Sequence, residues 1–130
     1  MRLKHFRLDT GAQILLACSD RARLRILNLI LVRGEMCITD IERVLDFTQS
    51  KTSRHLLYLR NSGILNMRKI NQWSFYTIKD EVLDVIRILL QFVAGDPELQ
   101  QDLKTCQILQ TNRELPGSDL LARQTTTRNA

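Results

Sequence analysis

The stretch from Thr48 to Leu65, TQSKTSRHLLYLRNSGIL, places hydroxyl, amide and cationic side chains first and leucines last, and it contains no acidic residue. Read as a helix, it has one apolar face and one polar face. The buried face would carry Thr52, Leu56 and Leu59, and the opposite face Ser50, Arg54, Leu57 and Asn61. Glutamine can pair bidentately with adenine and arginine with guanine, while hydroxyl groups suit phosphate oxygens. The leading turns therefore have the chemistry to contact double-stranded DNA, and the leucines would anchor the helix to its own domain.

The charge of the surrounding chain favours the same partner. No Asp or Glu occurs between Phe47 and Lys79, and the 130-residue chain carries a formal net charge of +5. The cations within this window are Lys51, Arg54, Arg60, Arg68, Lys69 and Lys79. A phosphate backbone would attract such a segment. The alternative is a solvated basic face on an ordinary small domain, but the cations coincide with a predicted helix and a predicted hairpin.

The elements expected around this helix are mainly helical. The chain is predicted to begin with a helix over 4–18 and a second helix capped by Ser19 and Asp20 and ended by Gly34. A short helix begun by the Thr39–Glu42 capping box follows, and then the helix from Thr48 to Gly63. Two strands joined by Asn71-Gln72, a helix over 80–94 and a helix from Asp96 to Gln110 complete the predicted order. A short helix, a turn, a second helix and a hairpin make a winged helix-turn-helix. The fold class is thus mainly α with a small β-hairpin. We expect one DNA-binding and dimerisation domain over 1–110 and a disordered polar tail over 111–130.

Three segments, LACSDRARLRILNLI, TQSKTSRHLLYLRNSGIL and MRKINQWSFYTI, resemble the ArsR/SmtB family of bacterial winged-helix repressors, over roughly residues 14–95. The resemblance implies a homodimer that binds a pseudo-palindromic operator and blocks transcription until an inducer acts. The DNA-facing positions would be Gln49, Ser50, Ser53 and Arg54, with Lys51 and His55 beside them. Arg68 and Lys69 fall near the hairpin tip, where a wing can touch the neighbouring minor groove. His55 has an equally good alternative as a polar residue packed at the helix flank.

The sensor is where this sequence departs from the family. Arsenic sensors carry two cysteines in a short motif, whereas EMCITDI has Cys37 followed by Thr39 in the second place. Zinc-type sensors carry Asp-x-His on the helix after the wing, whereas Asp84 is followed two residues later by an isoleucine. We therefore expect no metal site and no cofactor. A thiol switch or a soft-metal site using Cys37 and Cys106 stays open beside the alternative of structural thiols, and the inducer is not identified.

Other function classes find less support. The post-wing helix is apolar on more than one side, so it needs a second partner, and a homodimer through it and the first helix supplies one. The chain has two histidines, no Ser/His/Asp set and no phosphate-binding glycine loop, so we expect no enzyme. Three cysteines without a CxxC pair, no signal peptide and no membrane-spanning segment predict a cytoplasmic protein. A winged-helix protein-interaction module without DNA binding is the alternative function.

Overall fold

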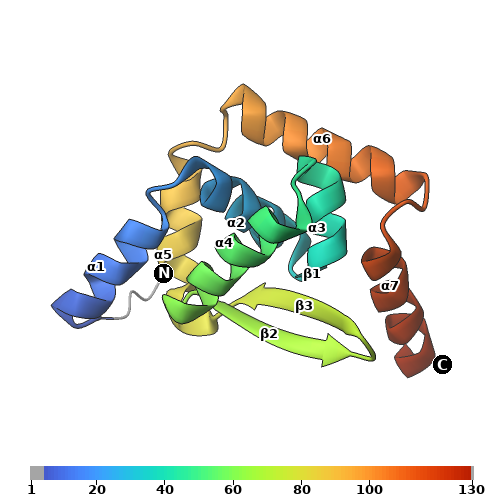
Figure 1. The fold of residues 1–130 in the computed structure, drawn as a ribbon, viewed down its shortest axis with the longest axis horizontal. Helices are drawn as coiled ribbons and strands as arrows, with labels where there is room; N and C mark the ends of the chain where they lie inside the picture. The colour runs from blue at the N-terminus through green and yellow to red at the C-terminus, as the bar shows by residue number, and fades with distance from the viewer. Residues whose placement is uncertain (1–4, 130) are drawn as a thin grey trace.

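The computed structural model describes residues 5–129. The elements are α1 (Leu8–Ala17), α2 (Arg21–Arg33), β1 (Met36–Cys37), α3 (Ile38–Leu45), α4 (Gln49–Asn61), β2 (Leu65–Ile70), β3 (Trp73–Ile78), α5 (Asp80–Gln91), α6 (Pro97–Thr111) and α7 (Pro116–Asn129). The predicted mainly helical winged helix-turn-helix is confirmed (Figure 1). The predicted start of the first helix at Lys4 lies outside the described residues, and α5 stops three residues before the predicted Ala94.

The helix-turn-helix is formed by α3, a three-residue turn and α4. Asp46 ends α3 in a left-handed conformation, with φ of 56°. Thr48 then caps α4, because its Oγ1 accepts a hydrogen bond of 3.2 Å from the backbone N–H of Lys51. The predicted cap of α3 at Thr39 is wrong. Cys37 occupies that position and its Sγ accepts from the N–H of Asp40, because the chain turns into the helix directly after β1.

The wing is the outer part of a three-stranded antiparallel sheet with the order β1-β3-β2. Ile70 pairs with Trp73, so the hairpin turns over Asn71 and Gln72 alone, as predicted. Asn71 has a φ of 55°, a left-handed conformation that asparagine tolerates well. The sequence did not predict β1, whose two residues pair with Tyr76 and Phe75 on β3.

The core is aliphatic, as the scarcity of aromatic residues requires. Fully buried side chains come from α2, α3, α4, β3 and α5, and include Ile26, Leu27, Ile30, Ile41, Leu56, Leu59, Phe75 and Ile86. Thr52, Leu56 and Leu59 have no exposed surface, so the predicted buried face of α4 is confirmed. This packing fixes α4 with its other face toward solvent.

The C-terminal segment differs from its prediction. Residues 116–129, expected to be irregular, form α7, which contacts α3 and β1. Its composition is polar and gives no amphipathic pattern, but its first turn is capped by a side chain from α3, a contact that local sequence cannot reveal. Within residues 5–129, no helix is long and apolar enough to cross a membrane.

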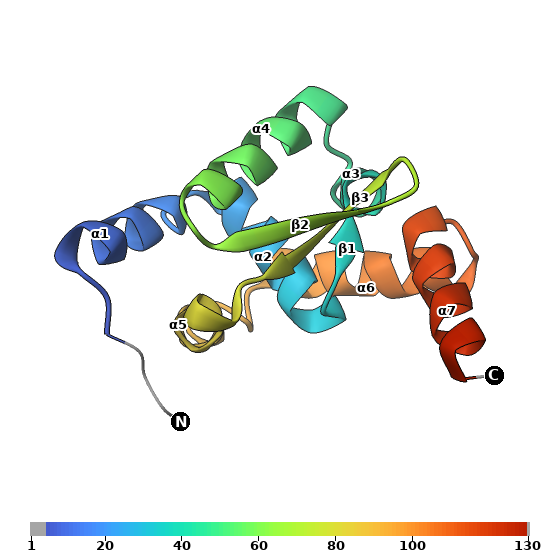
Figure 2. The same ribbon diagram turned by 90° about the horizontal axis from the view of Figure 1, so that it is seen from below.

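The helices form layers around α2 and α3. Figures 1 and 2 show α3 between α4 on one side and α6 on the other, with the β2–β3 hairpin running alongside α4. The first helix lies at one end of the molecule and α7 at the opposite end (Figure 1). Helix α4 and the hairpin therefore share one side of the molecule, and α6 and α7 both pack against α3.

Candidate DNA-binding surface

The exposed face of α4 gathers the polar residues predicted to meet DNA. Gln49, Ser50, Ser53 and Arg54 are all exposed, and none has a side-chain hydrogen bond or ion pair with another described residue. Their own domain leaves these donors and acceptors unused. The N-terminal turn is nevertheless well ordered, since the Oγ1 of Thr52 donates to the carbonyl oxygen of Thr48 at 2.8 Å.

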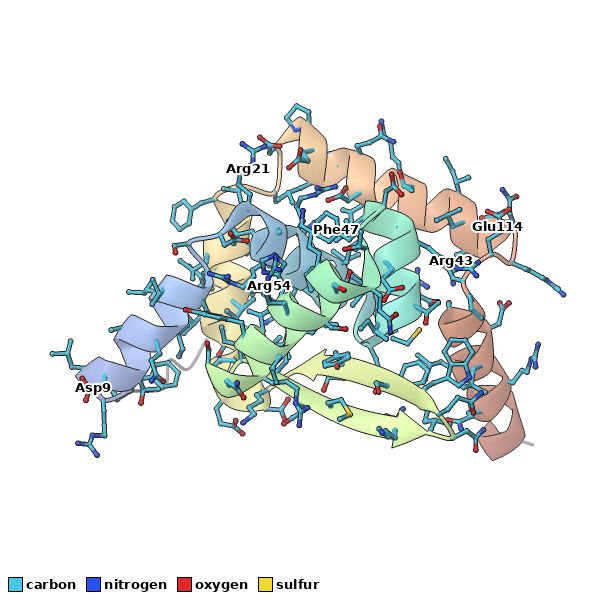
Figure 3. All side chains as sticks on the ribbon, in the orientation of Figure 1. Asp9, Arg21, Arg43, Phe47, Arg54 and Glu114 are labelled. Atoms are coloured by element: carbon cyan, nitrogen blue, oxygen red, sulfur yellow. The ribbon has the colours of Figure 1, made fainter. Side chains whose placement is uncertain are left out.

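Two cations of α4 lie in different surroundings. The ammonium of Lys51 sits 4.0 Å from the centre of the Phe47 ring, a cation–π contact that holds it at the start of the helix. Arg54 has no carboxylate within 4.0 Å among the described residues and projects from the exposed face of α4 (Figure 3). Its guanidinium is therefore free to meet a base or a phosphate.

The hairpin brings one free cation and one paired cation near the same surface. Arg68 forms two hydrogen bonds of 2.6 Å with the carboxylate of Glu35, which comes just before β1. This pairing raises the pKa of Arg68 and neutralises its charge locally. Lys69 is exposed and has no carboxylate within 4.0 Å in the part of the chain that the structure describes. Of the two wing residues predicted to touch DNA, only Lys69 is unpaired.

The imidazole of His55 does not share the exposed face. The residue is 9% exposed and lies close enough to Asp20 and Arg23 of the α2 region for their charges to influence it. Burial lowers its pKa, the Asp20 carboxylate opposes this shift, and the positive charges of Arg23, Arg54 and Lys51 add to it. This placement matches the alternative of packing at the helix flank and leaves His55 little surface with which to contact DNA.

Comparison with known proteins identifies this arrangement. Residues 20–67, which span the helix-turn-helix and the start of the wing, match the family model described as bacterial regulatory protein, arsR family. The arsenic resistance transcriptional regulator ArsR1 of Pseudomonas putida is 36% identical over 90 residues, which cover 68% of this chain and 70% of that protein. The chain belongs to the ArsR family. Accordingly, this protein is a DNA-binding transcriptional regulator with a winged helix.

Solved structures of ArsR-type regulators agree in fold. HlyU from Vibrio cholerae superposes with a TM-score of 0.62 at 32% identity, covering 67% of this chain and 95% of HlyU. A homodimeric winged helix-turn-helix DNA-binding domain from Mycobacterium bovis gives a TM-score of 0.60 at 27% identity, covering 68% of this chain and 82% of that domain. About a third of this ArsR-family chain therefore has no counterpart in either structure.

The cysteines of this ArsR-family chain are buried. Cys37 has no exposed surface, and burial together with the nearby Asp40 carboxylate raises the pKa of its thiol to about 12. Cys106 is 1% exposed and burial raises its pKa as well. Thiolates are the reactive form, so both sites disfavour thiol chemistry. No group of three or more His, Cys, Asp or Glu side chains among residues 5–129 is placed to hold a metal ion.

Two arginines that the sequence analysis did not single out contact the recognition helix or the turn before it. The Nε of Arg23 donates to the carbonyl oxygen of Ala17 at 2.7 Å, and its guanidinium stacks 4.1 Å from the ring centre of Tyr58 on α4. Arg25 binds Asp102 of α6 through two hydrogen bonds of 2.9 Å and faces the Phe47 ring. Both arginines alternate with apolar residues in RARLRIL, a pattern that indicates arginines at the edge of a buried helix face.

Proposed function

We propose that this ArsR-family regulator reads its operator with Gln49, Ser50, Ser53 and Arg54 on the leading turns of α4, while Lys51 and Lys69 bind phosphates. The observation that carries the proposal is that these side chains are exposed and make no hydrogen bond or ion pair with another described residue, on a face without carboxylates. A recognition helix enters the major groove with its N-terminal residues toward the bases. Arg68 is paired with Glu35 and does not contribute a free charge.

The functional unit we propose is a homodimer formed through α1 and α5. Large apolar side chains stay exposed on α1 and just after α5, and they include Leu8, Leu15, Leu16, Phe92 and Val93. On α5 itself only Val82, Ile86 and Leu90 are buried, so Leu83, Val85, Ile88 and Leu89 keep part of their surface. A twofold pairing would cover these residues and set two α4 helices about one DNA turn apart. The operator would then be pseudo-palindromic.

A dimer seated on such an operator would act as a repressor where the operator overlaps a promoter. An inducer then relieves repression only if it binds the DNA-free conformation more tightly than the DNA-bound one. The buried thiols of Cys37 and Cys106 are poorly placed to receive it directly, so we assign both a packing role.

The test is DNA binding measured by fluorescence anisotropy. The chain's own promoter fragment and a shuffled fragment of equal length are each titrated over a range of salt concentrations. Wild-type binding should weaken with salt, with a log–log slope of about −0.9 for each phosphate neutralised. Arg54→Ala should lose about 1–3 kcal/mol on the promoter fragment and less on the shuffled one, if Arg54 pairs with a guanine.

The matched control is Lys104→Ala, which removes an exposed cation from α6 and should leave both affinities unchanged. An equal loss on both fragments for Arg54→Ala would reassign Arg54 to a phosphate contact. Wild-type binding that does not respond to salt would rule out this surface as the DNA site.

A further inference from the structure

The buried carboxylate of Asp40 joins α3 of the helix-turn-helix to the C-terminal helix α7. Asp40 is 1% exposed. Its Oδ1 accepts a hydrogen bond of 3.1 Å from the backbone N–H of Gly117, and its Oδ2 accepts one of 2.8 Å from the N–H of Ser118. These amides belong to the first turn of α7, where N–H groups have no partner within the helix. A side chain 77 residues away in the sequence thus caps the helix.

The surrounding contacts make this junction close-fitting. A methyl group added at Gly117 would overlap the Sγ of Cys37 and lie 3.0 Å from Oδ2 of Asp40, so only glycine fits. Leu115, just before α7, is 1% exposed. On the same side, Arg43 of α3 donates a hydrogen bond of 2.9 Å to the carbonyl oxygen of Glu114 (Figure 3). Backbone, side chain and packing contacts therefore all connect α3 to the start of α7.

The buried part of α7 lies in its first turn. Beyond Gly117, no α7 residue up to position 124 is buried. Removing a carboxylate from water is costly, and burial accordingly raises the pKa of Asp40. A hydrophobic contact would hold two helices together without that cost, whereas two directed hydrogen bonds to a helix N-terminus fix how they meet. The two hydrogen bonds to Asp40 therefore define how α3 and the start of α7 meet.

The same α3 helix supports the recognition helix on its other side. Ile41, Val44 and Leu45 of α3 are buried in the core, and α3 packs against α4. Figures 1 and 2 show α3 held between α4 and the C-terminal helices, with α6 also contacting it. Any tilt of α3 would consequently move the N-terminal turn of α4 relative to the wing, because these elements are in direct contact.

We propose that Asp40 is a positioning residue for DNA recognition, and that α7, docked through Asp40, is part of the structure that binds the operator. The helix holds α3 in the orientation in which α4 and the wing can engage one operator half-site together. This inference rests on the proposed function of α4. It gives a role to a segment that lies outside residues 20–67, the part that matches the family model.

Two substitutions in the 130-residue chain disrupt the junction, one on α3 and one on α7. Asp40→Asn keeps the size of the side chain but removes its charge and one of its two acceptors. Gly117→Ala introduces the methyl group that the junction cannot hold, and Gly95→Ala is the matched control, since a methyl group there meets nothing within 4 Å. Cys37→Ala combined with Gly117→Ala removes the overlapping Sγ and should restore part of the lost binding.

Two readouts are taken at a temperature at which every variant is folded by circular dichroism. Amide hydrogen exchange of the segment 115–120 reports whether α7 is docked, and anisotropy reports affinity for the promoter and shuffled fragments. We expect faster exchange in both junction variants, with affinity for the promoter fragment reduced about tenfold and the preference over the shuffled fragment reduced with it. A purely structural role would lower thermal stability without changing the preference of folded protein for the promoter fragment.

Faster exchange with unchanged promoter affinity and preference would overturn the inference and leave the proposed function intact. Unchanged exchange in both variants would also overturn it, because Asp40 would not be what holds α7. A wild-type chain that does not prefer its promoter fragment would instead defeat the proposed function, and the inference with it. If Gly117→Ala fails to fold, Asp40→Asn alone decides between these outcomes.

Discussion

Removing the charge of Glu35 should strengthen DNA binding. In the free protein the two oxygens of Glu35 each accept a hydrogen bond of 2.6 Å from Arg68 on the wing. The side chain of Arg68 is 49% exposed and that of Glu35 is 19% exposed, so water reaches the pair from the Arg68 side. Such pairs contribute about 0–1 kcal/mol to stability, and Glu35→Gln should therefore have little effect on folding.

The magnitude of the effect on binding follows from counterion release. In Glu35→Gln the guanidinium of Arg68 becomes free to neutralise one phosphate. One added phosphate contact steepens the log–log salt slope by about 0.9 per protomer and, at roughly 0.1 M salt, contributes up to about eightfold in affinity. Promoter and shuffled fragments should gain equally, because a phosphate contact carries no sequence information.

Anisotropy titrations at four or more salt concentrations measure both quantities. Glu114→Gln is the control, because it makes the same change in net charge at the corner between α6 and α7, where the Glu114 side chain is exposed (Figure 3). Weaker binding by Glu35→Gln than by wild type would refute the reasoning, and would show that the pair instead holds the wing in its DNA-binding position.

Three further expectations concern stability and thiol chemistry. Burial lowers the pKa of His55 below its ordinary value of 6.5, so the unfolded chain binds the proton more tightly and the free energy of unfolding should fall as the pH drops below about 6.5. Urea unfolding at pH 8 and pH 5.5 should show this loss of stability in wild type but not in His55→Gln. Equal pH dependence in both proteins would contradict the expectation. Asp102→Ala leaves Arg25 without its two hydrogen bonds to Asp102 and should lower the free energy of unfolding, measured in urea, by about 3 kcal/mol. A decrease of less than about 1 kcal/mol would mean that Glu98, 3.7 Å from Arg25 Nε, takes the place of Asp102. Cys37 and Cys106 should label with a thiol reagent at pH 8 only as fast as the protein unfolds, and rapid labelling of the native chain at either position would reopen a thiol sensor.

The parts of the fold that could be predicted are those determined by residues close together in the sequence. Thr48 is followed at once by the helix it caps, Asn71 and Gln72 separate two strands, and the alternation of apolar residues changes period between them. The buried face of α4 follows from spacing alone. The burial of His55 could also be predicted from spacing, because it lies three residues after the buried Thr52 and next to Leu56, at the edge of the buried face.

The parts that were not predictable depend on contacts between distant positions. The two residues of β1 form a strand only because β3 is there to pair with them. The first turn of α7 is capped by Asp40, and the charge of Arg68 is neutralised by Glu35, 33 positions earlier in the chain. Local propensity gives no information on such partners, because each is defined by the tertiary fold that the rest of the chain adopts.

The electrostatic argument for DNA binding changes most when these contacts are included. Six cations lie between Phe47 and Lys79, and counting all of them would predict a log–log salt slope of about −5 per protomer. Arg68 is paired with Glu35 and Lys79 is partly buried, whereas Lys51 keeps its charge beside the Phe47 ring. Lys51, Arg54, Arg60 and Lys69 have no carboxylate within 4.0 Å among residues 5–129, which reduces the expected slope to about −4. A measured slope near −5 would mean that Arg68 or Lys79 also neutralises a phosphate when the protein binds DNA.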